Sequence, residues 1–357
     1  METNPFLGLL FHSIGGLAAA SFYIPYKSVK KWNWETYWLV GGFFSWIVAP
    51  WLLAMIILPQ TPHILSEVPF KTLFITWLFG VMWGVGGLTF GLTMRYLGIA
   101  LGYAIALGLC AAFGTLIPPL FSGELLTMVK TTSGQVILLG VFVCLGGIGL
   151  SGRAGISKEK ELSDEQKKDS VSEFNFSKGL IFAILAGIMS AAMAYGFAAG
   201  RPIAKIALEN DAPNLWQNLP VLIVVLFGGF VTNCTWCLYL IFKNKRTKDF
   251  FTSKLEGQKF SLSANYLLCA LAGLTWYLQF FFYGMGTTKM GKFEFSSWTL
   301  HMASIIIFST LWGIFLKEWK GTSKATKALI AAGLIVLVLS TVLIGLGSKM
   351  AVAAPSN

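Results

Sequence analysis

The sequence has few charged residues and few histidines. Of its 357 residues, 12% are Asp, Glu, Lys or Arg and three are histidine, whereas 55% are hydrophobic. A soluble domain carries about 25% charged residues, so this chain has too little charge for a water-exposed surface. Apolar runs of about 18 residues or more recur along its length, and each can cross a ~30 Å hydrocarbon core as a helix. The sequence therefore predicts an all-α integral membrane protein, with the lipid bilayer as its solvent.

Cysteine and histidine are too sparse for several other functions. The five cysteines lie in apolar runs, where cysteine behaves as a small hydrophobe, and Cys234 and Cys237 have no second cysteine pair or histidine near them. We expect no disulfide framework and no metal or redox role for these cysteines. The pattern also lacks the nucleophile, paired ligands or phosphate site of an enzyme, so we expect no enzymatic activity. No hydrophilic segment exceeds about 30 residues, which leaves no signalling domain for a sugar-sensing receptor.

Ten apolar runs are predicted to be transmembrane helices. They cover 5–26, 36–58, 72–94, 99–121, 134–151, 179–200, 215–242, 263–286, 294–316 and 325–347. The net charge of +11 would suggest nucleic acid in a soluble protein, but here 20 of the 27 Lys and Arg residues lie in, or within three residues of, the connections that follow odd-numbered helices. Cytoplasmic loops are enriched in these residues. We therefore predict no nucleic-acid partner, cytoplasmic odd connections, and both termini on the outer (periplasmic) face.

A charged stretch divides the chain into two sets of five helices. Residues 152–178 mix both signs of charge and have little apolar content, so we interpret them as a cytoplasmic linker between a first repeat, 1–151, and a second repeat, 179–357. An odd number of helices in each half makes the second half enter the membrane in the opposite direction. The sequence thus predicts two inverted five-helix repeats.

Glycine and tryptophan spacings support this duplication. Four residues around the third helix recur in the eighth at an offset of 193: Gly80, Trp83, Gly91 and Gly98 match Gly273, Trp276, Gly284 and Gly291. In the same way, Gly8 and Gly16 of the first helix match Gly179 and Gly187 of the sixth. Coincidence in a glycine-rich membrane protein is the alternative.

Ionisable residues inside the spans are candidates for proton coupling, because a charge in lipid is costly and usually serves a transport pathway. These are His12, Glu294 and His301, with Gln279 as an uncharged hydrogen-bonding partner. Glu294, Trp298 and His301 have i, i+4, i+7 spacing and share one helical face. The alternatives are a histidine bonded within the bundle and a glutamate favoured by the helix dipole.

The substrate is expected to be neutral. A phosphate would require Arg or Lys clamps, and no predicted span interior contains them. Mid-span aromatic residues offer flat apolar faces with a polar group, which suits a sugar ring. The candidates for substrate binding besides Gln279 are Trp83, Tyr103, Trp276, Tyr277 and Trp298. Many such residues are interfacial anchors instead.

Several long strings resemble the L-rhamnose-proton symporter family, which belongs to the drug/metabolite transporter superfamily. These are FYIPYKSVKKWNWETYW (22–38), LFGVMWGVGGLTFGLTMRYLGIALG (78–102), WYLQFFFYG (276–284), SSWTLHM (296–302) and LKEWK (316–320). The resemblance covers about residues 6–347 and is weakest in 152–178 and 201–262.

The resemblance implies a ten-helix protein of the bacterial inner membrane that imports L-rhamnose, and also sugars such as L-lyxose, with a proton and without a cofactor. While Glu294 stands where an aspartate is expected, the residues that match the family strings are His12, Lys27, Glu35, Arg95, Gln279, Trp298 and His301. Export of drugs or metabolites and sodium-coupled sugar transport, both known in the superfamily, remain as alternatives.

Overall fold

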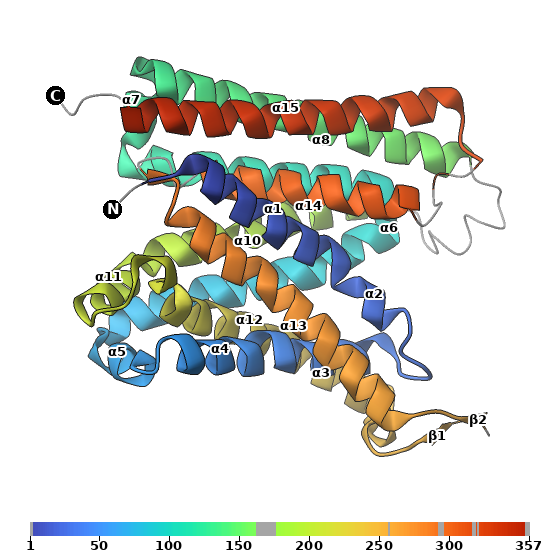
Figure 1. The fold of residues 1–357 in the computed structure, drawn as a ribbon. Helices are drawn as coiled ribbons and strands as arrows, with labels where there is room; N and C mark the ends of the chain where they lie inside the picture. The colour runs from blue at the N-terminus through green and yellow to red at the C-terminus, as the bar shows by residue number, and fades with distance from the viewer. Residues whose placement is uncertain are drawn as a thin grey trace. The chain divides into compact units, whose positions relative to one another are not determined.

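The computed structural model describes residues 3–161, 176–255, 258–291, 296–315, 319 and 321–353, and for some helical residues within these ranges only the backbone is described. In the first half of the chain the elements are α1 (Pro5–Ser21), α2 (Tyr23–Tyr26), α3 (Trp34–Phe43), the π-helical turn η1 (Phe44–Val48), α4 (Ala49–Ile57), α5 (Thr61–Glu67), α6 (Phe70–Ser122), α7 (Glu124–Lys130) and α8 (Thr132–Glu161) (Figure 1).

The second half is also helical apart from one small hairpin. Its elements are α10 (Phe176–Ala199), α11 (Arg201–Glu209), η2 (Asn214–Trp216), α12 (Leu219–Lys243), η3 (Thr247–Phe250), β1 (Lys254–Leu255), β2 (Gln258–Lys259), α13 (Leu262–Thr287), α14 (Ser296–Phe315) and α15 (Lys324–Ala353). The two short strands pair antiparallel within the connection from α12 to α13. Prolines occupy the first turns of α5, α11 and α12, where the missing N–H needs no helical partner.

Eight helical segments of the described residues are long and apolar enough to cross a membrane. They are Pro5–Tyr26, Trp34–Ile57, Phe70–Phe90, Thr132–Lys158, Ser177–Glu209, Asn214–Lys243, Leu262–Thr287 and Lys324–Gly347. Each begins within two residues of a predicted span. The prediction of an all-α membrane protein is therefore confirmed. The other two predicted spans, 99–121 and 294–316, fall largely in α6 and α14.

Helix α6 differs from the prediction, which separates helices at 72–94 and 99–121. The backbone is helical without interruption from Phe70 to Ser122. No proline lies in this element before Pro118, and a helix accommodates Arg95 and Gly98 at modest cost. The 53 residues of α6 correspond to about 80 Å of straight helix, so both predicted spans fit within this one element.

Helix α8 extends into the predicted linker, as far as Glu161. The Glu161 carboxylate accepts hydrogen bonds from the Ser323 N–H and the Thr326 hydroxyl, both at 2.6 Å, at the start of α15. The Lys158 ammonium lies 4.8 Å from the centroid of the Trp319 ring. Lys and Glu are good helix formers, and these contacts explain why 152–161 is helical. Residues 162–175 of the predicted linker lie outside the described residues.

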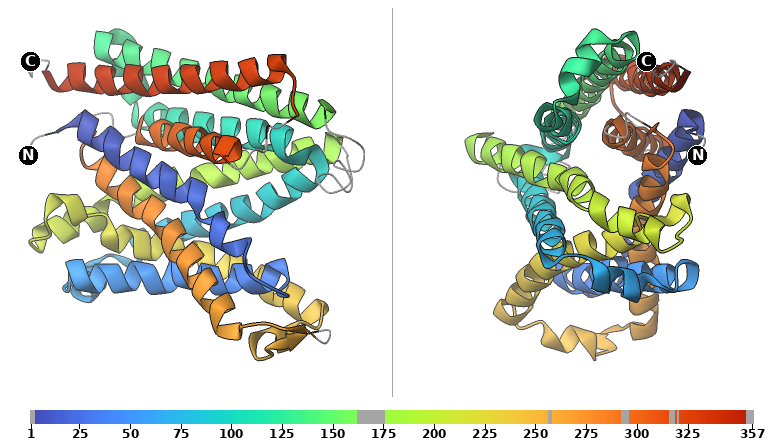
Figure 2. Two further views of the ribbon diagram at one scale, coloured as in Figure 1. Left: turned by 45° about the vertical axis from the view of Figure 1, so that its right-hand side comes forward. Right: turned by 90° about the vertical axis from the view of Figure 1, so that its left-hand side faces the viewer.

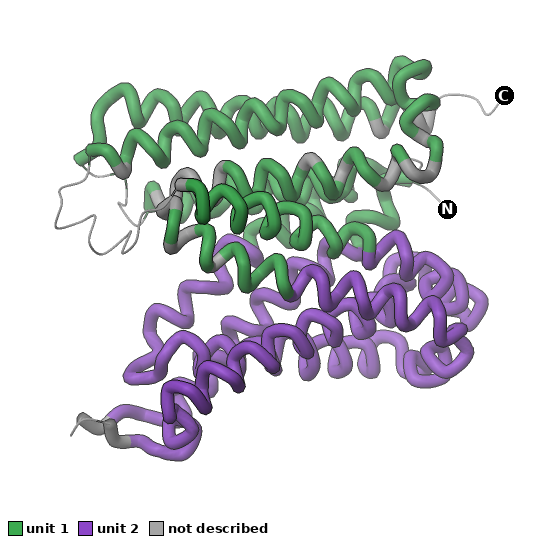
Figure 3. The backbone as a smooth tube through the Cα atoms, turned by 180° about the vertical axis from the view of Figure 1, so that it is seen from behind, with its two compact units in different colours: residues 1–17, 85–195, 285–357 green, residues 18–84, 196–284 purple. Residues whose placement is uncertain are grey.

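The chain forms two compact units, shown in Figure 3. Unit 1 contains Met1–Leu17, Val85–Tyr195 and Met285–Asn357, and unit 2 contains Ala18–Gly84 and Gly196–Gly284. Each unit takes segments from both predicted repeats. The two units are groups of residues that pack together in space, whereas the predicted repeats are stretches of sequence that resemble each other. The division into 1–151, 152–178 and 179–357 therefore stays a prediction.

In unit 1, α8 and α15 lie side by side (Figure 1). An added Cβ on Gly140 would lie 2.7 Å from Cγ1 of Ile344, and one on Gly333 would lie 2.6 Å from Oγ of Ser151. Only glycine permits so close an approach, and close packing is what drives helix association in lipid. The two contacts are related by one offset: Gly140 and Gly333 are 193 positions apart in the sequence, and so are Ser151 and Ile344.

Two further close crossings occur in unit 1. Helix α1 lies beside α14 (Figure 2), where a Cβ on Gly16 would overlap Ser304. Helix α10 contacts α6, where a Cβ on Gly187 would lie 2.5 Å from Cβ of Leu109. Small residues thus set the separation of both pairs.

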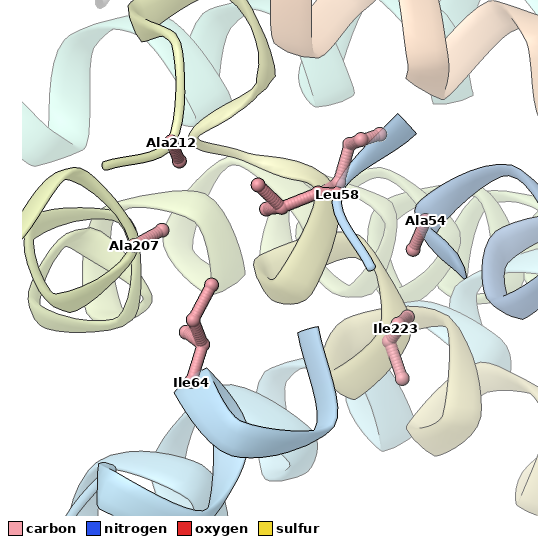
Figure 4. Packing of buried hydrophobic residues seen from close by; sticks show 7 residues of the cluster. Ala54, Leu58, Ile64, Ala207, Ala212 and Ile223 are labelled. Carbon is pink, nitrogen blue, oxygen red and sulfur yellow. The ribbon is translucent and has the colours of Figure 1, made fainter. Parts of the chain in front are cut away.

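Unit 2 is held by glycine crossings and an apolar cluster. A Cβ on Gly80 of α6 would overlap the backbone carbonyl of Val225 in α12, and one on Gly273 of α13 would overlap the carbonyl of Gly41 in α3. At one end of the unit, buried residues from α4, α5, α11 and α12 pack together (Figure 4). This cluster comprises Ala54, Leu58, Ile64, Ala207, Ala212, Leu219 and Ile223.

Candidate functional site

Two buried histidines meet in unit 1. His12 of α1 and His301 of α14 each have 0% of their surface exposed. Their ring centroids lie 6.3 Å apart, with the ring planes at 62°. Gly286 makes room for His12, since an added Cβ would lie 2.5 Å from Cε1 of the imidazole. The fold thus brings together two predicted proton-coupling residues that are far apart in the sequence.

Trp298 lies beside this pair, with its ring centroid 6.4 Å from that of His301. The side chain is buried, and its Nε1–H donates a 3.0 Å hydrogen bond to the backbone carbonyl of Cys110. A Cβ on Gly114 of α6 would overlap the indole. Trp298 is therefore held in one orientation by α6. Glu294, the third predicted proton-coupling residue, lies outside the described residues.

Four tryptophans gather in unit 2, and we call Trp38, Trp46, Trp83 and Trp276 the tryptophan cluster. The ring of Trp276 lies 5.0 Å from those of Trp38 and Trp46 and 6.3 Å from that of Trp83, measured between centroids. Phe22 stacks on Trp276 at 4.5 Å. The cluster joins α3, the π-helical turn, α6 and α13. It contains two predicted substrate-binding residues, Trp83 and Trp276.

The remaining predicted substrate-binding residues have different surroundings. Gln279 is buried in α13. Tyr277 is fully buried on the same helix, near Phe281 at 6.1 Å between centroids, and its hydroxyl has no hydrogen-bond partner among the described residues. Tyr103 lies in α6, and its side chain is outside the described part of the chain.

Two carboxylates are buried in a polar network of unit 2. Oε1 of Glu35 accepts a 2.8 Å hydrogen bond from Nδ2 of Asn244. Asp249 accepts a 3.2 Å hydrogen bond from the Thr36 hydroxyl and pairs with Nε of Arg246 at 3.2 Å. These contacts join the first turn of α3 to the segment that follows α12. Since both carboxylates are bonded within the protein, we assign them a structural role.

The sequence reasoning missed Trp38 and Trp46. Both lie in the predicted span 36–58, which contributes no candidate site residue. One signal was present: Pro50 lies four residues after Trp46, and a proline at that distance disturbs the α-helical turn that carries the tryptophan.

The two groups offer different chemistry. An imidazole can carry a proton, so the histidine pair is a candidate for proton movement. Aromatic faces suit the C–H face of a sugar ring, so the tryptophan cluster suits a neutral carbohydrate.

Comparison with known proteins agrees with this chemistry. The family described as L-rhamnose-proton symport protein (RhaT) matches residues 1–351. The chain is 38% identical over 351 residues to an L-rhamnose-proton symporter from Yersinia pestis (strain Pestoides F), covering 97% of this chain and 99% of that protein. It is 37% identical over 345 residues to one from Salmonella gallinarum (strain 287/91 / NCTC 13346), covering 96% of this chain and 97% of that protein. These relationships identify a transporter and not an enzyme. The chain belongs to the L-rhamnose-proton symport protein family.

Proposed function

We propose that this protein imports L-rhamnose together with a proton. The observation that carries the proposal is the match of the family over residues 1–351, with two named rhamnose-proton symporters at 37–38% identity. Counterflow tests the substrate. Proteoliposomes preloaded with unlabelled L-rhamnose should take up labelled L-rhamnose, and empty ones should not. Equal uptake with and without preloading would contradict the proposal.

One proton is sufficient for useful accumulation. Moving one elementary charge through ~100 mV yields about 2.3 kcal/mol. At ~1.4 kcal/mol per tenfold concentration ratio, this supports roughly fifty-fold accumulation of the sugar. Replacing the pH gradient with a sodium gradient separates proton coupling from sodium coupling. L-Lyxose, which we propose as a second substrate, should compete with L-rhamnose in counterflow.

We propose ten transmembrane helices in two inverted repeats. The support comes from matched contacts inside each unit. Gly80 and Gly273, which correspond at an offset of 193, each abut a backbone carbonyl in unit 2. The α8–α15 contacts of Gly140 and Gly333 in unit 1 are related by the same offset. An accidental glycine pattern would not be expected to produce equivalent close approaches.

We propose that the protein lies in the bacterial inner membrane, with both termini on the periplasmic side. The support is the concentration of Lys and Arg in the odd-numbered connections. Transport then proceeds by alternating access, in which the substrate site opens to one face at a time.

For proton coupling we propose Glu294, His301 and His12. The support is the buried position of both histidines and their 6.3 Å separation. Protonation of Glu294 from outside would neutralise a charge that is costly in a membrane and allow the loaded site to close. For substrate binding we propose Gln279, Trp298, Trp276, Tyr277, Trp83 and Tyr103.

The role of Glu294 has a sharp test. Glu294→Gln mimics the protonated carboxyl group, so it should exchange L-rhamnose in counterflow but fail to accumulate it in response to a pH gradient. Glu294→Asp is the matched control and should keep coupling. His301→Ala should weaken sugar binding more than coupling if the imidazole is a hydrogen-bonding partner. Accumulation by Glu294→Gln would move the proton carrier to His301 or His12.

A further inference from the structure

The backbone at Trp46 departs from the α-helix. Trp46 lies in the π-helical turn Phe44–Val48, between α3 and α4. In α-helical register its carbonyl would face the nitrogen of Pro50, which has no hydrogen to donate. In a π-helical turn a carbonyl bonds to the N–H five residues later instead of four. The proline four residues after Trp46 therefore explains why the helix is π-helical at this point. Such turns occur frequently at functional sites.

The indole of Trp46 is a buried donor that the protein does not satisfy. Its side chain is 2% exposed, and its Nε1–H has no hydrogen-bond partner among the described residues. Two other tryptophans of unit 2 have partners for their N–H groups. Trp38 donates to Oδ1 of Asn233 at 3.2 Å, and Trp32 donates to the carbonyl of Asp249 at 2.9 Å. Because an unsatisfied buried donor is destabilising, native proteins retain few of them, and each requires an explanation.

The surroundings of this donor fit a carbohydrate. The Trp46 ring centroid lies 5.0 Å from that of Trp276 and 5.9 Å from that of Trp83. Gly42 makes room for the ring, because an added Cβ would lie 2.5 Å from its Cζ3. A rigid N–H beside aromatic faces can bind the two parts of a sugar at once: an oxygen by hydrogen bonding and the C–H face by stacking.

We propose that Trp46 determines substrate specificity, its Nε1–H donating a hydrogen bond to one oxygen of the transported sugar. This inference rests on the proposed function, since it takes the neutral sugar of that transport cycle as the ligand. The donor that the protein leaves unsatisfied then becomes satisfied when the sugar binds. Trp38, whose N–H is already bonded to Asn233, contributes a stacking face only.

The test compares Trp46→Phe with Trp38→Phe in counterflow, using L-rhamnose and its single-deoxy analogues. For Trp46→Phe we expect about a three- to tenfold rise in the half-saturating concentration of L-rhamnose. One deoxy analogue should bind the wild type and Trp46→Phe equally well, because it lacks the oxygen that accepts the hydrogen bond. Trp38→Phe should show no such dependence on a single hydroxyl.

Thermal stability gives the second readout. Replacing Trp46 by 3-benzothienylalanine, which keeps the shape of the ring but has sulfur in place of the N–H, removes an unsatisfied donor without leaving a cavity. This variant should unfold in detergent at the same or a higher temperature than the wild type. Trp38→Phe leaves Asn233 without its donor and should unfold at a lower temperature. A lower unfolding temperature for the 3-benzothienylalanine variant would mean that the N–H of Trp46 is bonded within the protein, which would overturn the proposal.

An isosteric replacement tests the donor itself. Replacing Trp46 by 3-benzothienylalanine, which has sulfur in place of the N–H, should reproduce the binding defect of Trp46→Phe while preserving the shape of the ring. Unchanged half-saturation for every analogue would refute the role of Trp46. Absence of L-rhamnose counterflow in the wild type would instead refute the proposed function.

Discussion

His12 and His301 lie with their ring centroids 6.3 Å apart, although 289 residues separate them in the sequence. Both side chains are fully buried in unit 1. They come from α1 and α14, whose close approach depends on Gly16 beside Ser304. The packing of these two helices therefore fixes the relative position of the imidazoles.

The first prediction concerns Gly286, whose added Cβ would lie 2.5 to 2.8 Å from three atoms of the His12 ring. Gly286→Ala should displace the imidazole and lower proton-driven uptake several-fold while the protein still folds. Gly149→Ala is the control, because a Cβ there meets nothing within 4 Å. Uptake and folded yield are measured for both variants. Full activity of Gly286→Ala would mean that the position of His12 does not affect transport.

The second prediction concerns the α8–α15 pair. Leucine at Gly140 or Gly333 should force the helices apart, since even a single Cβ would lie within 3 Å of the opposite helix at both positions. Overpacking of this kind costs about 1–3 kcal/mol, so the yield of folded protein in detergent should fall. Gly149→Leu should be tolerated. If only one of the two glycines proved sensitive, the matched contacts would not be equivalent, which would weaken the proposal of a repeat.

Much of this fold could be predicted because a bilayer imposes a strict length and hydrophobicity on each span. The starts of eight spans follow directly from apolar runs. The continuity of α6 could not be predicted, because Arg95 and Gly98 look like a loop but are compatible with a helix. Helix α8 extends to Glu161 because of contacts with Ser323 and Thr326 that are distant in the sequence.

The candidate site was predicted only in part. His12 and His301 stood out because ionisable residues are rare in apolar spans, and their juxtaposition is a property of the tertiary fold. Trp46 did not stand out, because the sequence contains 13 tryptophans. What distinguishes Trp46 is an unsatisfied N–H, and hydrogen-bond partners such as Asn233 for Trp38 become visible only in the structure.

The third prediction concerns Glu161. Hydrogen bonds from the Ser323 hydroxyl, the Thr326 hydroxyl and the Ser323 N–H lower the pKa of this carboxyl group from 4.5 to about 2. A lowered pKa means that the contribution to stability is present above pH 4.5 and is lost as the pH falls towards 2. Glu161→Gln should therefore unfold at a slightly lower temperature than the wild type between pH 5 and 8. This difference should shrink below pH 4.5, as measured by thermal unfolding in detergent. A difference that grew on acidification would contradict the assignment.

The fourth prediction concerns membrane orientation. Single cysteines introduced into 243–262, for example at Lys248, should react with an impermeant thiol reagent only from the cytoplasmic side. The native cysteines give a low background, because four of the five are buried and Cys234 is partly buried. The unmodified protein is the control. Reaction from the periplasmic side would reverse the proposed orientation.

The most direct test of the central claim is uptake of labelled L-rhamnose into proteoliposomes under an imposed pH gradient, acidic outside. The account predicts transient accumulation above the external concentration, abolished by a protonophore and not restored by a sodium gradient. Uptake that only reaches the external concentration, whatever the pH gradient, would contradict proton-coupled import.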